Sequence, residues 1–459
     1  MAKKRDGERS TNRRKNISKS PAKTNQSSES SNSSSNSDQT LKPLNLFLIF
    51  IVISAISIIV YRTLYGSTAV SVVRSVYDRD LVKTEVKYHE IIAEHSRVSS
   101  NLSRFFQNPV LAYVTPWNSK GYELAKEFSY KLNHISPVWY DLKRSPRALG
   151  TELGINTDAL LFVLHSSQGA NLVLEGRHNA DKGWISELRK KGDAQIVPRV
   201  VLEAVPMDLL KKKKQRDKAI NLIIAECSEM EYDGIVLESW SRWAAYGVLH
   251  DPDTRKMALK FILELGQAMH SVGLEMESKK SLQLVYVIGP PRSEMLKEYD
   301  FGPEDLRTLS DVVDGYSLMT YDFSSPQNPG PNAPLKWIHS VMQLLLRSTD
   351  SSSQTLAQKI FIGINFYGND FALSGGLGGG PIIGREYLSL MERYRPSLQW
   401  EINSAEHYFV YTGDQNDQHV VFYPSLLSIA KRLEEAQSWG AGISIWEIGQ
   451  GLDYFFDVL

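Results

Sequence analysis

The segment YDGIVLESW, residues 232–240, brings an acidic and an aromatic side chain to the end of an apolar run. Side chains two residues apart on a β-strand point to the same face, so Val236, Glu238 and Trp240 are predicted to share one face, with Trp240 outermost. A carboxyl group at the end of a buried strand can transfer a proton or hold a polar ligand, whereas an indole N–H only donates a hydrogen bond. The segment therefore predicts a pocket in which Glu238 is the candidate acid.

Aromatic side chains end most of the other predicted strands, among them Tyr113, Trp117, Tyr321, Tyr367 and Trp446. Any one of these rings can simply fill a core, but their concentration at strand ends indicates a binding surface. A sugar ring offers apolar C–H faces that pack on flat aromatic groups, while its hydroxyl groups need polar partners nearby. An oligosaccharide or glycoconjugate is therefore the ligand class that the pattern favours.

The elements that must position these residues are apolar runs that alternate with amphipathic helical patterns from about residue 108 onwards. The eight strand candidates lie within residues 109–117, 134–142, 195–204, 233–240, 282–291, 312–323, 359–368 and 440–449. Continuous apolar runs are typical of parallel strands buried on both faces, and eight βα units favour a closed barrel over an open sheet. We therefore predict an α/β fold, a (β/α)₈ TIM barrel over residues 108–459. A hairpin is possible within 143–180, and 369–424 is predicted to be a small insertion after strand seven.

The N-terminal part has a different composition. Residues 1–42 carry ten Lys and Arg against four Asp and Glu and little apolar surface, which predicts a disordered cytosolic tail. Residues 43–61 carry no charge, and about nineteen helical residues cross a hydrocarbon core, so this segment is predicted to be a transmembrane signal anchor. The positive-inside rule then gives a type II protein. Residues 62–107 become a stalk, and the barrel is placed in the lumen of the endoplasmic reticulum, Golgi or lysosome, or secreted after cleavage.

The charge balance also bears on partners. The whole chain is neutral, so the residues after 42 carry a net charge of −6, which argues against a nucleic-acid partner for the folded part. The single cysteine, Cys227, cannot form an intrachain disulfide. No metal-ligand spacing or cofactor motif is recognised. The Gly-rich SGGLGGGP in the insertion does not lead from a strand into a helix with a lysine, so it does not predict a phosphate loop.

Three motifs resemble glycoside hydrolase family 18, the chitinases. YDGIVLESW is similar to that family's strand-four signature, in which Asp-Gly is followed by two inward aspartates and a final glutamate at alternate positions. LMTYDF (318–323) is similar to its sixth-strand Met-x-Tyr-Asp, and GISIWEIGQGLDYF (442–455) to its eighth strand. The resemblance covers about residues 108–459. It implies that Met319, Tyr321, Asp322 and Trp446 contact an N-acetylhexosamine.

The resemblance also implies a lost catalytic group. Val236 stands at the first aspartate and Glu238 at the second, and Trp240 replaces the glutamate that protonates the leaving oxygen. General acid catalysis is worth about 10²–10⁴-fold, so we expect a chitinase-like protein that binds N-acetylglucosamine-containing oligosaccharides without hydrolysing them. Two alternatives stay open. One is a glycosidase with Glu238, Glu447 or Asp322 as the acid, and the other is a ligand-free scaffold for a protein receptor.

Overall fold

The computed structural model describes residues 43–64, 72–145, 172–203, 206–275, 281–291, 295–347, 351–373, 379–414 and 416–459. The predicted tail at 1–42 and the first arm of the possible hairpin lie outside these residues. The chain divides into two units, residues 1–71 and 72–459.

Helix α1 (Pro43–Leu64) is the element described in the first unit, and it contains the apolar run predicted to be an anchor. A search of the described residues identifies no helix that combines the length and the apolar character needed to cross a membrane. The predicted span at 43–61 stays a prediction.

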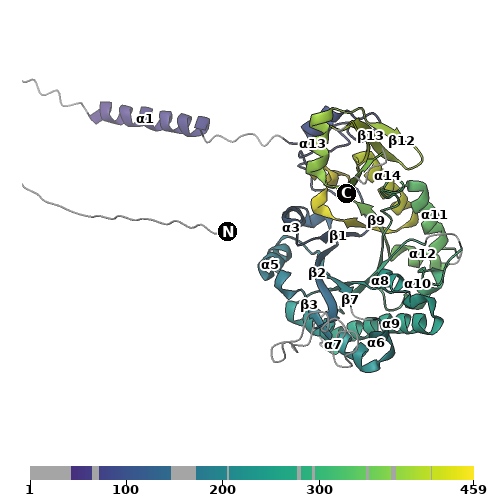
Figure 1. Cartoon of the computed structure of the whole chain (residues 1–459). Helices are drawn as coiled ribbons and strands as arrows, with labels where there is room; N and C mark the ends of the chain where they lie inside the picture. Colours follow the sequence, from purple (N-terminus) through teal and green to yellow (C-terminus); the bar gives the residue numbers. More distant parts are fainter. Residues whose placement is uncertain are drawn as a thin grey trace, which may run out of the picture. The chain divides into compact units, whose positions relative to one another are not determined.

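The second unit is built on a closed barrel (Figure 1). Among the described residues, eight parallel strands form its ring: β1 (Val110–Val114), β2 (His134–Arg144), β5 (Arg199–Leu202), β6 (Gly234–Glu238), β7 (Gln283–Ile288), β8 (Gly315–Leu318), β9 (Ile360–Asn365) and β15 (Gly442–Trp446). They pair in chain order, and β1 pairs with both β2 and β15, which closes the ring. The predicted TIM-barrel fold is confirmed.

Helices follow the strands of this ring, and most of them cover its outside. They are α3 (Ser119–Glu127), α5 (Lys182–Lys191), α6 (Pro206–Lys211), α7 (Lys213–Met230), α8 (Trp240–Ala245), α9 (Pro252–Glu275), α10 (Pro303–Leu309), α11 (Leu335–Leu345), α12 (Ser351–Gln358) and α14 (Leu426–Trp439). The strands are buried on both faces, so the apolar side chains divide into two cores. One core fills the space between strands and helices, and a smaller one fills the barrel interior with residues such as Leu111, Val236, Val285 and Phe361.

The start of β6 shows why the motif begins with Asp-Gly. A Cβ on Gly234 would lie 2.1 Å from the carbonyl oxygen of Gln283, so the close approach of β6 to β7 requires glycine. The Asp233 carboxylate accepts a hydrogen bond from the Ile196 backbone N–H at 2.8 Å and pairs with Arg189 at 3.2 Å. Both residues of the motif therefore serve the barrel frame.

Two additions extend the barrel. Strand β3 (Leu172–Glu175) pairs antiparallel with the end of β2, and the short strand β4 (Gln195–Ile196) precedes β5. Pro198 lacks a backbone N–H and interrupts the third barrel strand between β4 and β5. The end of β2 pairs with β3 on one side and with β5 on the other.

The insertion after β9 forms its own antiparallel sheet (Figure 1). Its strands are β10 (Gly368–Ala372), β11 (Gly379–Ile382), β12 (Gln399–Glu401), β13 (Glu406–Thr412) and β14 (Gln418–Phe422), with helix α13 (Gly384–Tyr394). Within it, His419 lies between Asp370 and Asp417, at 2.8 and 2.7 Å from their carboxylates. The sheet occupies the stretch predicted as an insertion.

Residues 72–107, predicted to be a stalk, belong to the compact unit. This stretch contains helix α2 (Tyr88–Glu94) and buries Val76 and Phe106. Arg79 reaches the Asp457 carboxylate at 3.1 Å, and His407 of the insertion lies 2.9 Å from the Thr84 carbonyl oxygen. The folded unit therefore begins at Val72 and not near residue 108, because these scattered apolar residues find partners far along the chain.

Candidate functional site

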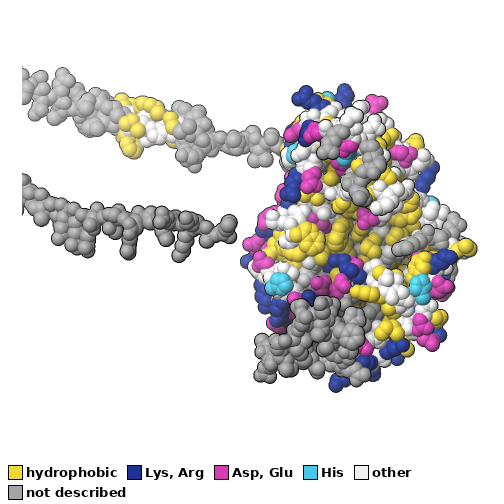
Figure 2. Space-filling model, in the orientation of Figure 1, with side chains coloured by type: hydrophobic (Ala, Val, Ile, Leu, Met, Phe, Trp, Pro, Cys, Tyr) yellow, Lys and Arg dark blue, Asp and Glu magenta, His cyan; other side chains and the backbone are white. Residues whose placement is uncertain are grey.

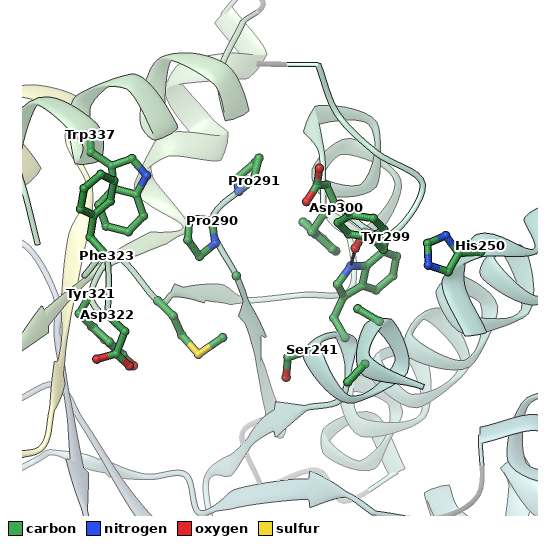
Figure 3. A pocket seen from close by; sticks show the side chains of 16 residues that line it. Ser241, His250, Pro290, Pro291, Tyr299, Asp300, Tyr321, Asp322, Phe323 and Trp337 are labelled. Atoms are coloured by element: carbon green, nitrogen blue, oxygen red, sulfur yellow. Dashed lines mark hydrogen bonds between the residues drawn. The ribbon is translucent and has the colours of Figure 1, made fainter. Parts of the chain in front are cut away.

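A pocket of about 830 Å³ lies beyond the ends of β6, β7 and β8. Figure 3 shows Tyr321, Asp322, Phe323 and Trp337 on one side, Tyr299, Asp300 and His250 on the other, and Pro290 and Pro291 between them. This volume is in the range of small-ligand sites, and the C-terminal ends of barrel strands are where such sites form. Figure 2 shows hydrophobic side chains gathered over the middle of this unit, with charged side chains around them.

Trp240 forms part of the second wall. Strand β6 ends at Glu238, Ser239 is the N-cap, and Trp240 is the first residue of α8. Its indole N–H donates to the Tyr299 carbonyl oxygen at 2.8 Å, and its ring lies 5.1 Å from that of Phe301. This differs from the expected position on the inward face of the strand. The change from strand to helix breaks the two-residue alternation and turns the indole into a side wall.

The opposite wall follows β8. Asp322 has a φ of +60°, and its backbone N–H donates to the Asn332 side-chain oxygen at 2.7 Å. The Tyr367 hydroxyl donates to the Asp322 carboxylate. Phe323 is 49% exposed and lies 5.1 Å from the Trp337 ring. This wall therefore presents a carboxylate and apolar ring surface side by side.

A buried ion pair supports this wall from behind. The Glu406 carboxylate of β13 accepts the backbone N–H groups of Asn332 and Ala333 at 3.0 and 2.7 Å, and Arg432 of α14 donates to it at 2.9 Å. Burial raises the pKa of Glu406, and burial lowers the pKa of Arg432, while the opposite charge of each partner counteracts the shift. The insertion thus anchors the loop that carries Asn332, and through it Asp322.

Glu238 lies inside the barrel, as the alternation predicts. Arg199 of β5 donates through Nε, at 2.8 Å, and through Nη2 to the same carboxylate oxygen of Glu238. The Ser241 hydroxyl donates to the other oxygen at 3.3 Å. The Arg199 guanidinium also lies 5.3 Å from the centre of the Trp446 ring, which contacts Tyr113 at 5.1 Å. The inward carboxylate is therefore held by a cation.

The predicted site residues thus fall into four groups. Trp240, Met319, Tyr321 and Asp322 line the pocket. Tyr113, Glu238 and Trp446 lie together in the barrel interior, and Tyr367 lies behind Asp322. Trp117, in the loop after β1, is 69% exposed and is not among the described residues that line the pocket.

Glu447, an alternative acid, points elsewhere. It is completely buried and accepts hydrogen bonds from the Asn118 side-chain amide at 2.6 Å and the Gly449 N–H at 2.9 Å. Burial raises the pKa of Glu447, and these hydrogen bonds oppose that shift. Its contacts fix the start of α3. Burial also raises the pKa of Tyr321 and Tyr367, so both phenols stay protonated near neutral pH.

Several pocket residues were not predicted. They are Ser241, Tyr299, Asp300, Phe301 and Trp337, which come from helices and loops rather than from strand ends. Arg199 was also missed, although it is the one charge in the buried run IVPRVVL, and that position could have marked it. Among the residues that the structure describes, no cluster of His, Cys, Asp and Glu has the arrangement to hold a metal ion.

The fold and the pocket define a TIM barrel with an aromatic cleft beyond the ends of its strands. Residues 207–451 match the model of the glycosyl hydrolases family 18, and the chain belongs to this family.

Solved structures with the same fold include a chitinase from Chromobacterium violaceum ATCC 12472, with a TM-score of 0.58 and 18% identity over 77% of this chain and 98% of that one. The spore cortex-lytic enzyme SleL of Bacillus megaterium QM B1551 has a TM-score of 0.57 and 16% identity, over 78% of this chain and 74% of that one.

Among curated proteins, the cortical fragment-lytic enzyme of Bacillus subtilis (strain 168) is 25% identical over 204 residues, 43% of this chain and 44% of that protein. The chain of Bacillus anthracis with the same name is 27% identical over 164 residues, 35% of this chain and 37% of that one. The matches therefore span less than half the length of these relatives.

Proposed function

We propose that the chain is a chitinase-like saccharide-binding protein that takes N-acetylglucosamine-containing oligosaccharides into the pocket between Trp240 and Trp337 without family-type hydrolysis. Membership of the family and the ring surface that Phe323 and Trp337 present to the pocket support this ligand class. Sugar hydroxyl groups would find partners in Ser241, Asp300 and Asp322, which line the same pocket. The observation that carries the proposal is that Trp240, the residue aligned with the family's acid, is an indole built into the pocket wall, because an indole cannot act as the proton donor.

The remaining inward carboxylate is poorly placed to replace that acid. A glycosidase needs a carboxylic acid that hands its proton to the leaving oxygen. Glu238 lies below the pocket, does not line it, and binds the Arg199 guanidinium through one oxygen and Ser241 through the other. A role in positioning the barrel mouth suits Glu238 better than proton transfer.

A glycosidase that uses pocket carboxylates is the second candidate. Asp300 and Asp322 line the pocket from opposite walls (Figure 3), and a glycosidase needs two acidic groups, one on each side of the glycosidic bond. Asp322 already accepts the Tyr367 hydroxyl, which favours an acceptor role for it. We rank this candidate second for that reason.

The proposal also includes a particular branch of the family. The motifs HISPVWYDLKR, YSLMTYDFS and PGPNAPLKW resemble those of the stabilin-interacting chitinase-like proteins within the family. We infer that the chain is related to that branch, in which a protein receptor is a possible partner.

The test is a calorimetric titration of the purified chain with chitotetraose, with product analysis of the same mixture over one day. Binding without cleavage supports the proposal. Trp337→Ala should then weaken binding about three- to tenfold, the value of one aromatic stacking contact, while the exposed Trp117→Ala serves as the matched control and should change nothing. Cleavage that is lost in Asp322→Asn would favour the second candidate. Absence of both binding and cleavage would contradict both.

A further inference from the structure

The pocket does not lie over the centre of the barrel. Its described lining residues come from the segments that follow β6, β7 and β8 and from the first turn of α11. Arg199 of β5, Trp446 of β15 and Tyr113 of β1 do not line it. The cavity is therefore displaced toward one side of the mouth, although the barrel interior holds an aromatic floor.

One face of that floor is covered, although Trp446 remains partly exposed. The Trp446 ring contacts Tyr113 at 5.1 Å, and the Arg199 guanidinium carbon lies over the ring at 5.3 Å from its centre. A cation over an indole face takes the position that the apolar face of a sugar would use for stacking. A saccharide cannot pack on this face of Trp446 while Arg199 stays in place.

Arg199 is also held in place. Its Nε and Nη2 both donate to one oxygen of Glu238, and Ser241, which lines the pocket, donates to the other oxygen. The Arg199 and Glu238 side chains are 13% and 11% exposed, so little water is available to replace these bonds. Lifting the guanidinium off Trp446 would leave a nearly buried carboxylate without its cation, which is strongly unfavourable.

We propose that Arg199 is a specificity-determining residue that covers one face of Trp446, so that saccharides bind in the pocket between Trp240 and Trp337 and do not stack on that indole. This inference rests on the proposed function, because it assigns the part of the mouth that a saccharide uses. It adds that Glu238 serves to hold Arg199 over the indole. The covered indole face thus limits how much of a chitooligosaccharide the protein engages.

The experiment compares chitotetraose affinities by calorimetry for four forms of the full chain: the natural protein, Trp446→Ala, Arg199→Ala/Glu238→Gln, and the triple variant. The double substitution removes both charges together, which avoids an unpaired Glu238. Arg242→Ala, which removes an arginine that pairs with Glu203 at 3.0 Å, is the matched control. Thermal unfolding verifies that each variant is folded.

The natural protein and Trp446→Ala should bind equally within twofold. The Arg199→Ala/Glu238→Gln variant should bind about three- to tenfold more tightly, because one indole face becomes available for stacking, and the triple variant should lose this gain. If Arg199 had only a structural role, any gain in chitotetraose affinity would not depend on the presence of Trp446. Arg242→Ala should bind like the natural protein.

Two results would overturn the inference. One is a tenfold or greater loss of affinity in Trp446→Ala alone, which would mean that the sugar already stacks there. The other is a folded Arg199→Ala/Glu238→Gln variant that gains no affinity. If the natural protein fails to bind but the double variant binds through Trp446, the proposed function is wrong and the cover is supported. If neither form binds, both are overturned.

Discussion

Replacing Arg432 should reveal how strongly the insertion supports the pocket wall. Arg432 is 3% exposed and donates to Glu406 at 2.9 Å. It also donates to the backbone carbonyl oxygens of Ser428 at 2.7 Å, Ala405 at 3.0 Å and Ser404 at 3.2 Å, and to that of Ala333. Arg432→Met keeps much of the side-chain volume but removes every one of these donors.

The expected loss is large. Breaking a buried ion pair by removing one partner costs about 3–5 kcal/mol, since the remaining charge stays buried without compensation. Each buried carbonyl oxygen that loses its donor adds up to about 1–3 kcal/mol, although several of them keep room for another partner. We therefore expect Arg432→Met to lower the free energy of unfolding by at least about 3 kcal/mol. Arg432→Met/Glu406→Gln should lower it by less than the sum of the two single changes, because no charge stays unpaired.

Urea denaturation of the single and double variants measures these values, with Lys431→Met as the control. Lys431 is the adjacent residue on α14, pairs with Glu434 at 2.7 Å and is 40% exposed, so its loss should change stability by less than about 1 kcal/mol. The chitotetraose titration gives a second measurement. Glu406 accepts the backbone N–H of Asn332, and Asn332 accepts that of Asp322, so loss of the ion pair should also weaken saccharide binding. A loss below 1 kcal/mol in Arg432→Met, or strict additivity in the double variant, would refute this reasoning.

Three further predictions follow from buried or paired groups. Burial raises the pKa of the Cys227 thiol to about 12, so iodoacetamide should alkylate it only after denaturation, and rapid labelling of the native protein would contradict its burial. Burial works against a charge on His419, but hydrogen bonds to the two neighbouring aspartates outweigh it and raise its pKa above the ordinary 6.5. Its stabilising effect should therefore be complete below about pH 6.5 and be lost as the pH rises through the raised pKa, and thermal midpoints of His419→Gln should lack that decline. Trp240→Phe removes the donor to the Tyr299 carbonyl oxygen and should lower the free energy of unfolding by about 1–3 kcal/mol without creating hydrolysis, which product analysis checks.

The sequence predicted the barrel because its signals are local. Continuous apolar runs mark strands buried on both faces, and the alternation within GIVLE places Val236 and Glu238 inside the barrel, as the structure has them. The same alternation failed for Trp240, because α8 begins there and a helix turns successive side chains by about 100° instead of 180°. The residue at which a strand ends is therefore harder to predict from local sequence than the strand itself.

The residues that sequence reasoning missed depend on contacts between distant segments. Arg199 and Glu238 are 39 positions apart. In the pocket wall, Phe323 contacts Trp337, which comes from the next helix. Residues 72–107 read as polar, yet they dock against the insertion and the last turn of the chain. Local composition does not identify such partners. The sequence separation of two contacting residues depends on the topology of the barrel and not on the periodicity of one helix or strand.

The pairing of β1 with β15 has a consequence for how the chain folds. Val110 lies opposite Ile443, so the ring cannot close until a strand more than three hundred residues later has emerged from the ribosome. During synthesis β1 stays unpaired on the side that β15 later covers, while the strongly apolar strands β6 and β9 are already made. Contacts of such long sequence separation form slowly, and open parallel edges favour aggregation. Truncation before Gly442 should therefore give an insoluble chain in need of chaperones, in contrast to shortening at an external loop.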